Sequence, residues 1–240
     1  KIFEDRLQGK PGAKRVEVTA LGKIVRELST RPDIPGKALQ QTLDIDLQEY
    51  AARRLGPESG SVVVMDCETG DILAMTSMPS FDPNSFSDGI GTLEYGMLRA
   101  DDHVPLRDKA LRGLYPPGST VKPMDTLAFM KAGISPEETV SCGGGLRIGN
   151  RRFGCWKRGG HGTVDMAKAI YQSCDVYFYK MAMRLGYDPV ALMARDLGMG
   201  AKYDLPVSSQ SYGTVPDTQW MQKKHKRSWQ NFDSANSIIG

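Results

Sequence analysis

The stretch that decides the fold is Tyr115-Pro116-Pro117-Gly118-Ser119-Thr120-Val121-Lys122-Pro123. Two consecutive prolines and a glycine favour a turn directly before Ser119. If a helix begins there, Ser119 and Lys122 lie three positions apart on one face, within side-chain reach. A serine needs an adjacent base to become a nucleophile, and a lysine whose pKa is lowered by its surroundings can be that base. The segment predicts Ser119 as nucleophile and Lys122 as general base, although a short Ser-x-x-Lys match also occurs by chance at the start of surface helices.

A second polar motif, Ser173-Cys174-Asp175, follows about fifty residues later. Side chains two positions apart on a continuous helix diverge by about 200°. Two groups that serve one site at this spacing therefore need a turn, and we expect the motif in a tight connection between two helices. Ser173 would relay a proton there, while Asp175 would hold Lys122. Both residues would also bind and orient the substrate.

The pattern of apolar residues around these motifs predicts an α+β or α/β fold with a segregated helical lobe. A helix capped by Asp44 ends at Gly56, and two apolar runs, 61–66 and 72–75, surround a Gly-containing turn that is typical of a β-hairpin. Because both runs are nearly continuous in apolar residues, we expect this sheet to be covered on both faces. Residues 79–113 have the composition of loops. Helices are expected after Thr163 as an N-cap, over 176–185, and from Asp188 as an N-cap to Gly198.

The first 40 residues predict the edge of a small β-rich domain and a linker. Runs 15–19 and 24–28 alternate like strands around a Leu21-Gly22-Lys23 turn, and prolines follow.

The whole sequence of 240 residues has a formal net charge of +3, which does not predict a nucleic-acid partner. The basic run Lys223 to Arg227 is interpreted as a solvated loop. No apolar run reaches the length of a bilayer span.

The two motifs and several shorter segments resemble the penicillin-binding protein 2 family. Its members are class B, monofunctional, elongation-type peptidoglycan D,D-transpeptidases. Asp rather than Asn at the third position of the Ser-x-Asp motif is typical of the elongation type. The other shared segments are Thr42-Leu43-Asp44, Val64-Met65-Asp66 through Gly70, Pro79-Ser80-Phe81-Asp82-Pro83-Asn84, Gly160-His161-Gly162 and Val176-Tyr177-Phe178-Tyr179.

The resemblance implies a penicillin-binding, serine β-lactamase-like domain in which a sheet is flanked by a helical lobe. Residues 1–40 would be a remnant of the pedestal or dimerisation domain, and residues 41–240 the N-terminal portion of the transpeptidase domain. Ser119 would attack the D-Ala–D-Ala bond of a stem peptide, and a second stem peptide would complete the cross-link. β-Lactam antibiotics would acylate the same serine. The implied partners are a membrane glycan polymerase and other elongation-complex proteins. The implied location is the bacterial inner membrane, with a single-pass anchor outside this chain and the catalytic domain in the periplasm.

One departure from the family concerns its third motif. No Lys-Thr-Gly or Lys-Ser-Gly occurs in these residues, so this stretch alone is expected to acylate poorly or not at all. We expect the remainder to have been deleted or to lie outside these residues. Two other functions remain open. One is a serine β-lactamase or D,D-carboxypeptidase, and the other is a non-catalytic penicillin-binding sensor or scaffold.

Three cysteines and a histidine form a possible zinc site. Cys142, Cys155, His161 and Cys174 follow one another at spacings of 13, 6 and 13 residues, which match no standard zinc finger. Three thiolates and one imidazole are nevertheless a closed tetrahedral ligand set for structural zinc. The alternatives are a Cys142–Cys155 disulfide, which a periplasmic location permits, or free thiols. Cys67 has no partner nearby in sequence and is interpreted as structural or incidental.

Overall fold

A computed structural model describes residues 2–87, 89–207 and 209–240. The chain divides into two compact units. The first comprises residues 1–113 and 204–210, and the second comprises residues 114–203 and 211–240. The predicted boundary after residue 40 lies inside the first unit and stays a prediction. Among the described residues, no helix has the length and apolar character needed to cross a membrane.

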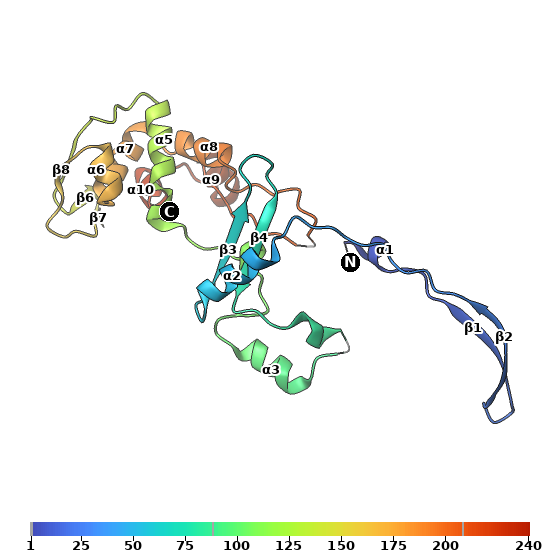
Figure 1. Cartoon of the computed structure of the whole chain (residues 1–240). Helices are drawn as coiled ribbons and strands as arrows, with labels where there is room; N and C mark the ends of the chain where they lie inside the picture. The colour runs from blue at the N-terminus through green and yellow to red at the C-terminus, as the bar shows by residue number, and fades with distance from the viewer. Residues whose placement is uncertain (1, 88, 208) are drawn as a thin grey trace. The chain divides into compact units, whose positions relative to one another are not determined.

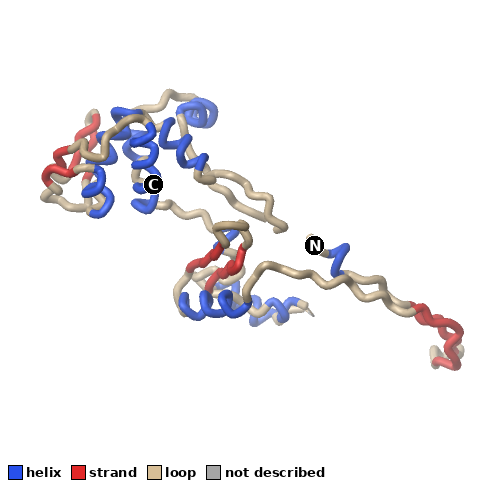
Figure 2. The backbone as a smooth tube through the Cα atoms, turned by 45° about the horizontal axis from the view of Figure 1, so that its top comes forward, coloured by secondary structure: helices blue, strands red, loops and turns tan. Residues whose placement is uncertain are grey.

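The first unit begins with a short helix and an antiparallel hairpin. Helix α1 (Glu4–Leu7) precedes strands β1 (Ala13–Val18) and β2 (Ile24–Arg31), which confirms the two predicted strands. Gly22 lies in the connecting turn with a φ of 78°, a conformation that favours glycine. Nearly every side chain of the hairpin is exposed, and Figure 2 shows no other strand or helix of the first unit alongside it.

A second hairpin and one helix pack together in this unit. Strands β3 (Gly60–Met65) and β4 (Ile72–Met78) pair in antiparallel register, and helix α2 (Ile45–Leu55) packs against β4. Asp44 caps α2 by accepting a hydrogen bond from Leu47 N at 3.0 Å, as predicted. The expectation of two covered faces is wrong for the described chain. Alternate residues of β3 stay exposed, with Val63 at 48% and Met65 at 55%, because the described elements cover only part of the hairpin.

Three short elements occupy the stretch that the sequence predicted as loops. They are the 3-10 helix η1 (Pro83–Phe86) and helices α3 (Thr92–Ala100) and α4 (Lys109–Arg112). Helix α3 contains Gly96, a poor helix former, buries none of its residues, and lies in a stretch whose prolines and glycines favour loops.

Helix α7 (Asp175–Leu185) is the centre of the second unit. Seven of its residues are buried, and it contacts helices α5 (Lys122–Lys131), α6 (Met166–Tyr171) and α10 (Asn231–Ser237). Helices α8 (Asp188–Asp196) and α9 (Thr218–His225) complete the helical group in Figure 1. The core contains Phe129, Tyr177, Phe178 and Ile238, which have no exposed surface. This packing confirms the predicted helical lobe.

Four short strands lie against these helices and were not predicted. They are β5 (Val140–Cys142), β6 (Gly145–Ile148), β7 (Arg151–Gly154) and β8 (Gly162–Val164), and they pair as β5–β8 and β6–β7. Strands of three or four residues between glycines are too short to show a period in the sequence.

Two helix caps and one loop differ from the predictions. Thr163 lies within β8, and Asp165 caps α6 instead, by accepting from Lys168 N at 2.7 Å. Asp188 is the first residue of α8 rather than its cap. The basic run from Lys223 to Arg227 covers the end of α9 and the turn after it, so part of the predicted loop is helical, and the run is exposed throughout.

Candidate active site

Ser119 lies in a tight turn at the start of α5. It belongs to the 3-10 helix η2 (Gly118–Val121), which leads directly into α5. Gly118 has a φ of 56°, which a residue with a side chain rarely adopts, and Thr120 Oγ1 donates to Pro117 O at 2.6 Å. The turn leaves Ser119 exposed and Lys122 buried, with 1% of the lysine accessible. Ser119 is therefore open to a large substrate, while its neighbouring amine is withdrawn from water.

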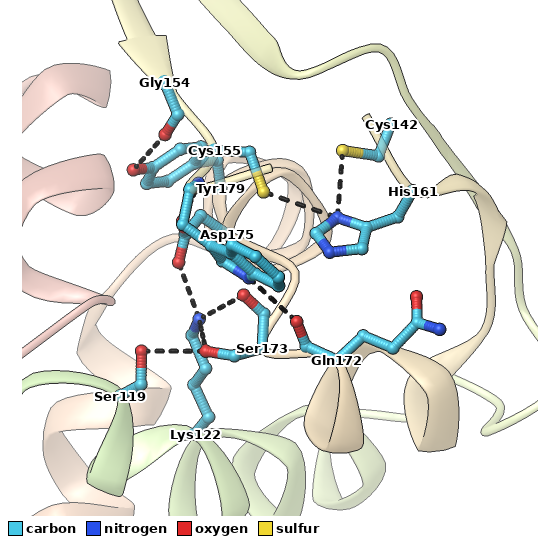
Figure 3. Close-up of polar contacts among 11 residues, drawn as sticks. Ser119, Lys122, Cys142, Gly154, Cys155, His161, Gln172, Ser173, Asp175 and Tyr179 are labelled. Carbon is cyan, nitrogen blue, oxygen red and sulfur yellow. Dashed lines mark hydrogen bonds and ion pairs between the residues drawn. The ribbon is translucent and has the colours of Figure 1, made fainter. Parts of the chain in front are cut away.

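The amine of Lys122 has three close acceptors. Its Nζ donates to Asp175 Oδ1 at 2.6 Å, to Ser173 Oγ at 3.0 Å and to Ser173 O at 3.1 Å (Figure 3). Three acceptors match the three N–H donors of an ammonium group. The Phe178 ring lies 5.1 Å from Nζ and adds a cation–π contact. The lysine is thus held in one orientation by charge, hydrogen bonds and an aromatic face.

Ser173 joins the lysine to the nucleophile. Its Oγ donates to Ser119 Oγ at 3.0 Å while it accepts from Lys122 Nζ. The described contacts include no direct hydrogen bond between Ser119 and Lys122. The two side chains lie close together, as the sequence indicated, but the path between them runs through a second hydroxyl.

The Asp175 carboxylate is stabilised both by its place at the start of a helix and by its hydrogen-bond partners. It is the first residue of α7, where the helix dipole stabilises a carboxylate. Its Oδ1 faces Lys122, and its Oδ2 accepts from the backbone N–H of Trp156 at 3.2 Å. Ser173 lies two residues before Asp175, in the turn that leads into α7, and has a φ of 50°. The prediction of a tight connection between two helices is therefore confirmed, and the turn spans the gap between α6 and α7.

Asp125 is a buried carboxyl group that the sequence analysis did not single out. It lies three residues after Lys122 on α5, is 1% exposed, and its Oδ2 has no hydrogen-bond partner among the described residues. Burial raises the pKa of Asp125 to about 8, although the nearby charge of Lys122 opposes this shift. The three-residue spacing from Lys122 was the signal that would have revealed it.

The four residues of the predicted metal site come together. The Sγ atoms of Cys142, Cys155 and Cys174 and a ring nitrogen of His161 all lie within 4.8 Å of one another, and all four residues are buried. His161 Nδ1 is 3.6 Å from Cys142 Sγ and 3.5 Å from Cys155 Sγ. Ligands around a tetrahedral zinc, at about 2.3 Å for sulfur and about 2.0 Å for nitrogen, stand about 3.5–3.8 Å apart. The donor set and the two distances from His161 to sulfur fit a zinc ion.

The cysteines of this cluster are not bridged. Cys142, Cys155, Cys174 and the exposed Cys67 form no disulfide, so the alternative of a Cys142–Cys155 disulfide is not realised in this structure. Burial raises the pKa of Cys174 to about 12, and burial together with the charge of Lys157 lowers the pKa of His161. His161 Nε2 is buried and has no hydrogen-bond partner among the described residues.

Trp156 is a second residue that the sequence analysis missed. Its indole Nε1 donates to Gln172 O at 2.9 Å, one residue before Ser173, and its ring meets His161 edge to face at a centroid distance of 5.4 Å. An aromatic residue directly after a candidate ligand, Cys155, was the available signal.

Comparison with known proteins gives the family of the chain. The family described as "Penicillin binding protein transpeptidase domain" matches residues 60–232, and "Penicillin-binding Protein dimerisation domain" matches residues 1–41. The chain is similar over its whole length to the peptidoglycan D,D-transpeptidase MrdA of Salmonella typhimurium, at 38% identity, and of Escherichia coli, at 34% identity. It spans 39% and 38% of those relatives, respectively.

Solved structures agree with these relatives. The complex of penicillin-binding protein PBP2 with MreC from Helicobacter pylori matches all of this chain and 45% of its own chain, with a TM-score of 0.84 and 32% identity. The Pseudomonas aeruginosa PBP2 in complex with WCK 5153 matches 88% of this chain and 46% of its own, with a TM-score of 0.79 and 38% identity. The chain belongs to the penicillin-binding protein transpeptidase family.

Proposed function

We propose that this chain is the serine-acylating part of a peptidoglycan D,D-transpeptidase of cell elongation, with Ser119 as its nucleophile. The observation that carries the proposal is the continuous hydrogen-bonded path from Ser119 Oγ through Ser173 Oγ to Lys122 Nζ and Asp175. An exposed hydroxyl connected to a buried amine is the arrangement that serine acylation without a histidine requires.

The acylation step follows this path. When Lys122 is neutral, its amine accepts a proton from Ser173, and Ser173 accepts the hydroxyl proton of Ser119. The Ser119 oxygen then forms a bond to the carbonyl carbon of the D-Ala–D-Ala peptide bond. The C–N bond breaks, and the terminal D-alanine leaves after its nitrogen takes the proton from Lys122 through Ser173. The product is an ester between Ser119 and the donor stem peptide.

Transfer reverses these proton movements. The amine of a second stem peptide attacks the ester carbonyl and loses a proton to the same relay. The C–O bond to Ser119 breaks, and the serine oxygen regains its proton. Asp175 keeps the Lys122 amine in place throughout, because its carboxylate accepts the shortest of the three hydrogen bonds that the amine donates. β-Lactams place a reactive carbonyl at the same point and acylate Ser119.

The proposal includes a structural zinc ion held by Cys142, Cys155, His161 and Cys174. Its support is a buried Cys₃His set whose ligand atoms all lie within 4.8 Å of one another, with His161 Nδ1 at 3.6 Å and 3.5 Å from two of the sulfur atoms. The ion would cross-link the loops that bear these four residues and would take part in no step of the reaction. Because Cys174 lies between Ser173 and Asp175, the bound ion would tether the turn that carries both polar side chains.

The whole protein's setting is also a proposal. PBP2 of Helicobacter pylori has been solved in a complex with MreC, and another matched structure describes the coordination of polymerization and crosslinking by a peptidoglycan synthase complex. We infer that the protein works beside such elongation partners, including a membrane glycan polymerase. Its anchor would lie in the bacterial inner membrane and its catalytic domain in the periplasm.

A fluorescent penicillin tests the assignment of the nucleophile. The full-length protein should form a stoichiometric adduct that mass spectrometry maps to Ser119, and Ser119→Ala should form none. Thr120→Ala is the matched control, because its hydroxyl contacts only Pro117 O, and it should still be labelled. An adduct that survives Ser119→Ala would refute the assignment. Rapid loss of the adduct, with turnover of a chromogenic cephalosporin, would instead indicate a β-lactamase.

A further inference from the structure

The turn at residues 172–175, which connects α6 to α7, is held from two sides. On one side, Lys122 donates to the backbone and hydroxyl oxygens of Ser173 and to Asp175 Oδ1. On the other side, Trp156 uses both of its N–H groups. Its backbone N–H reaches Asp175 Oδ2 at 3.2 Å, and its indole N–H reaches Gln172 O at 2.9 Å. Trp156 thus contacts Gln172, directly before Ser173, and the second carboxylate oxygen of Asp175, whose first oxygen contacts Lys122.

The backbone of this turn needs such support. Ser173 has a φ of 50°, in the left-handed region that a residue with a side chain rarely adopts. Such a conformation persists only where surrounding contacts enforce it. Since Ser173 Oγ contacts both Ser119 and Lys122, a change in this backbone would separate the relay from the nucleophile.

Trp156 belongs to the segment that bears two of the candidate zinc ligands. It directly follows Cys155, and its ring packs edge to face on His161 with an interplanar angle of 65°. The residue is 65% exposed, so burial does not fix its position. Its place instead depends on the loop between Cys155 and His161 and on the His161 ring.

We infer that Trp156 is a positioning residue that links the cysteine–histidine cluster to the acylating turn. Ordering of the loop around a bound zinc ion holds the indole and the backbone N–H of Trp156, and these two donors hold Gln172 O and Asp175. This inference rests on the proposed function in two respects, since the turn must take part in acylation and the cluster must bind zinc. It assigns to an exposed tryptophan a role in the rate at which Ser119 reacts.

The first experiment measures acylation by a fluorescent penicillin in the full-length protein. Trp156→Phe keeps a ring against His161 but removes the indole donor. We expect the first-order acylation rate constant to fall roughly three- to tenfold, the effect of one lost hydrogen bond. The dissociation constant of the initial complex, the final stoichiometry and the melting temperature should be unchanged. Trp220→Phe is the matched control, because its ring packs on His225 and Lys224 within α9, and it should react at the wild-type rate.

The second experiment uses tryptophan fluorescence and does not depend on activity. Metal is removed from the full-length protein with a chelator, and one equivalent of zinc chloride is then added. Emission from the wild type and from Trp220→Phe should change on removal and return on addition. Trp156→Phe should bind the same zinc and show little or no change.

Each result decides one part of the inference. If Trp156→Phe is acylated with the rate constant of the wild type, the positioning role is overturned. A zinc-dependent emission change that persists in Trp156→Phe, or that is absent from zinc-loaded wild type, overturns the link to the cluster. If wild-type Ser119 takes no label at all, the proposed function fails, and the fluorescence comparison still decides the link.

Discussion

Lys122 Nζ and Asp175 Oδ1 lie 2.6 Å apart in a largely dry site, with 2% of the lysine side chain and 13% of the aspartate side chain exposed. Buried ion pairs are sensitive to the loss of one partner, because the remaining charge then lacks both water and a counterion. This pair ties the first helix of the site, α5, to the first residue of α7.

Removing the Asp175 carboxylate should therefore affect both stability and reaction. Asp175→Ala leaves Lys122 unpaired and should lower the free energy of unfolding by about 3 kcal/mol. Asp175→Asn keeps an acceptor and should have a smaller effect. Urea unfolding and the acylation rate should both rank the variants in the order wild type, Asn, Ala. An Ala variant as stable as the wild type would contradict this ranking.

Ser173 allows the chemical role of a residue to be separated from its structural role. Ser173→Gly removes the relay hydroxyl, yet glycine readily adopts the φ of 50° found there. We expect unchanged or higher thermal stability, with acylation slower by about 100-fold or more, the usual effect of losing a proton-transfer group. Ser173→Ala should be acylated as slowly as Ser173→Gly and should also be less stable than the wild type. Wild-type acylation by the glycine variant would exclude the relay.

Asp125 should make stability depend on pH. Its pKa in the folded protein is raised to about 8 by burial, against a reference value of 3.8. Between these values the folded state binds more protons than the unfolded state, so the free energy of unfolding falls as pH rises from about 4 to about 8. The slope from this one group is at most about 1.4 kcal/mol per pH unit.

Asp125→Asn should remove that slope. In urea unfolding, the free energy of unfolding of Asp125→Asn minus that of the wild type should increase from pH 5 to pH 8. Above pH 8 this difference should stay constant. Asp196→Asn is the control, since Asp196 is exposed and pairs only at the surface with Lys131. If the difference between Asp125→Asn and the wild type is the same at every pH, the carboxyl group is not protonated in the folded protein.

Zinc content tests the cysteine–histidine cluster directly. Elemental analysis of the purified protein should give about one zinc per chain, and His161→Ala or Cys142→Ser should lose it. Cys67→Ser should retain the metal, because Cys67 is exposed and lies outside the cluster. Chelation should also lower the melting temperature of the wild type. Protein that contains no zinc when isolated without chelators would end the hypothesis.

The local chemistry of the site could be read from the sequence because it depends on neighbours along the chain. The Pro116-Pro117-Gly118 turn, the Asp44 cap and the β3–β4 hairpin each follow from backbone preferences of a few adjacent residues. The Ser-x-x-Lys spacing likewise places two side chains on one side of a helix start. The four candidate ligands were proposed as a set from residue type alone.

Contacts between distant segments were decided only by the tertiary structure. The path from Ser119 to Lys122 passes through Ser173 because packing of α7 against α5 brings a turn from 51 residues away onto the lysine. Trp156 reaches Asp175, and the 4.8 Å cluster closes, because the short strands β5, β6 and β7 fold back against α7 and β8 lies against α6. Such strands have no readable period, so only the folded chain determines which donors face which acceptors.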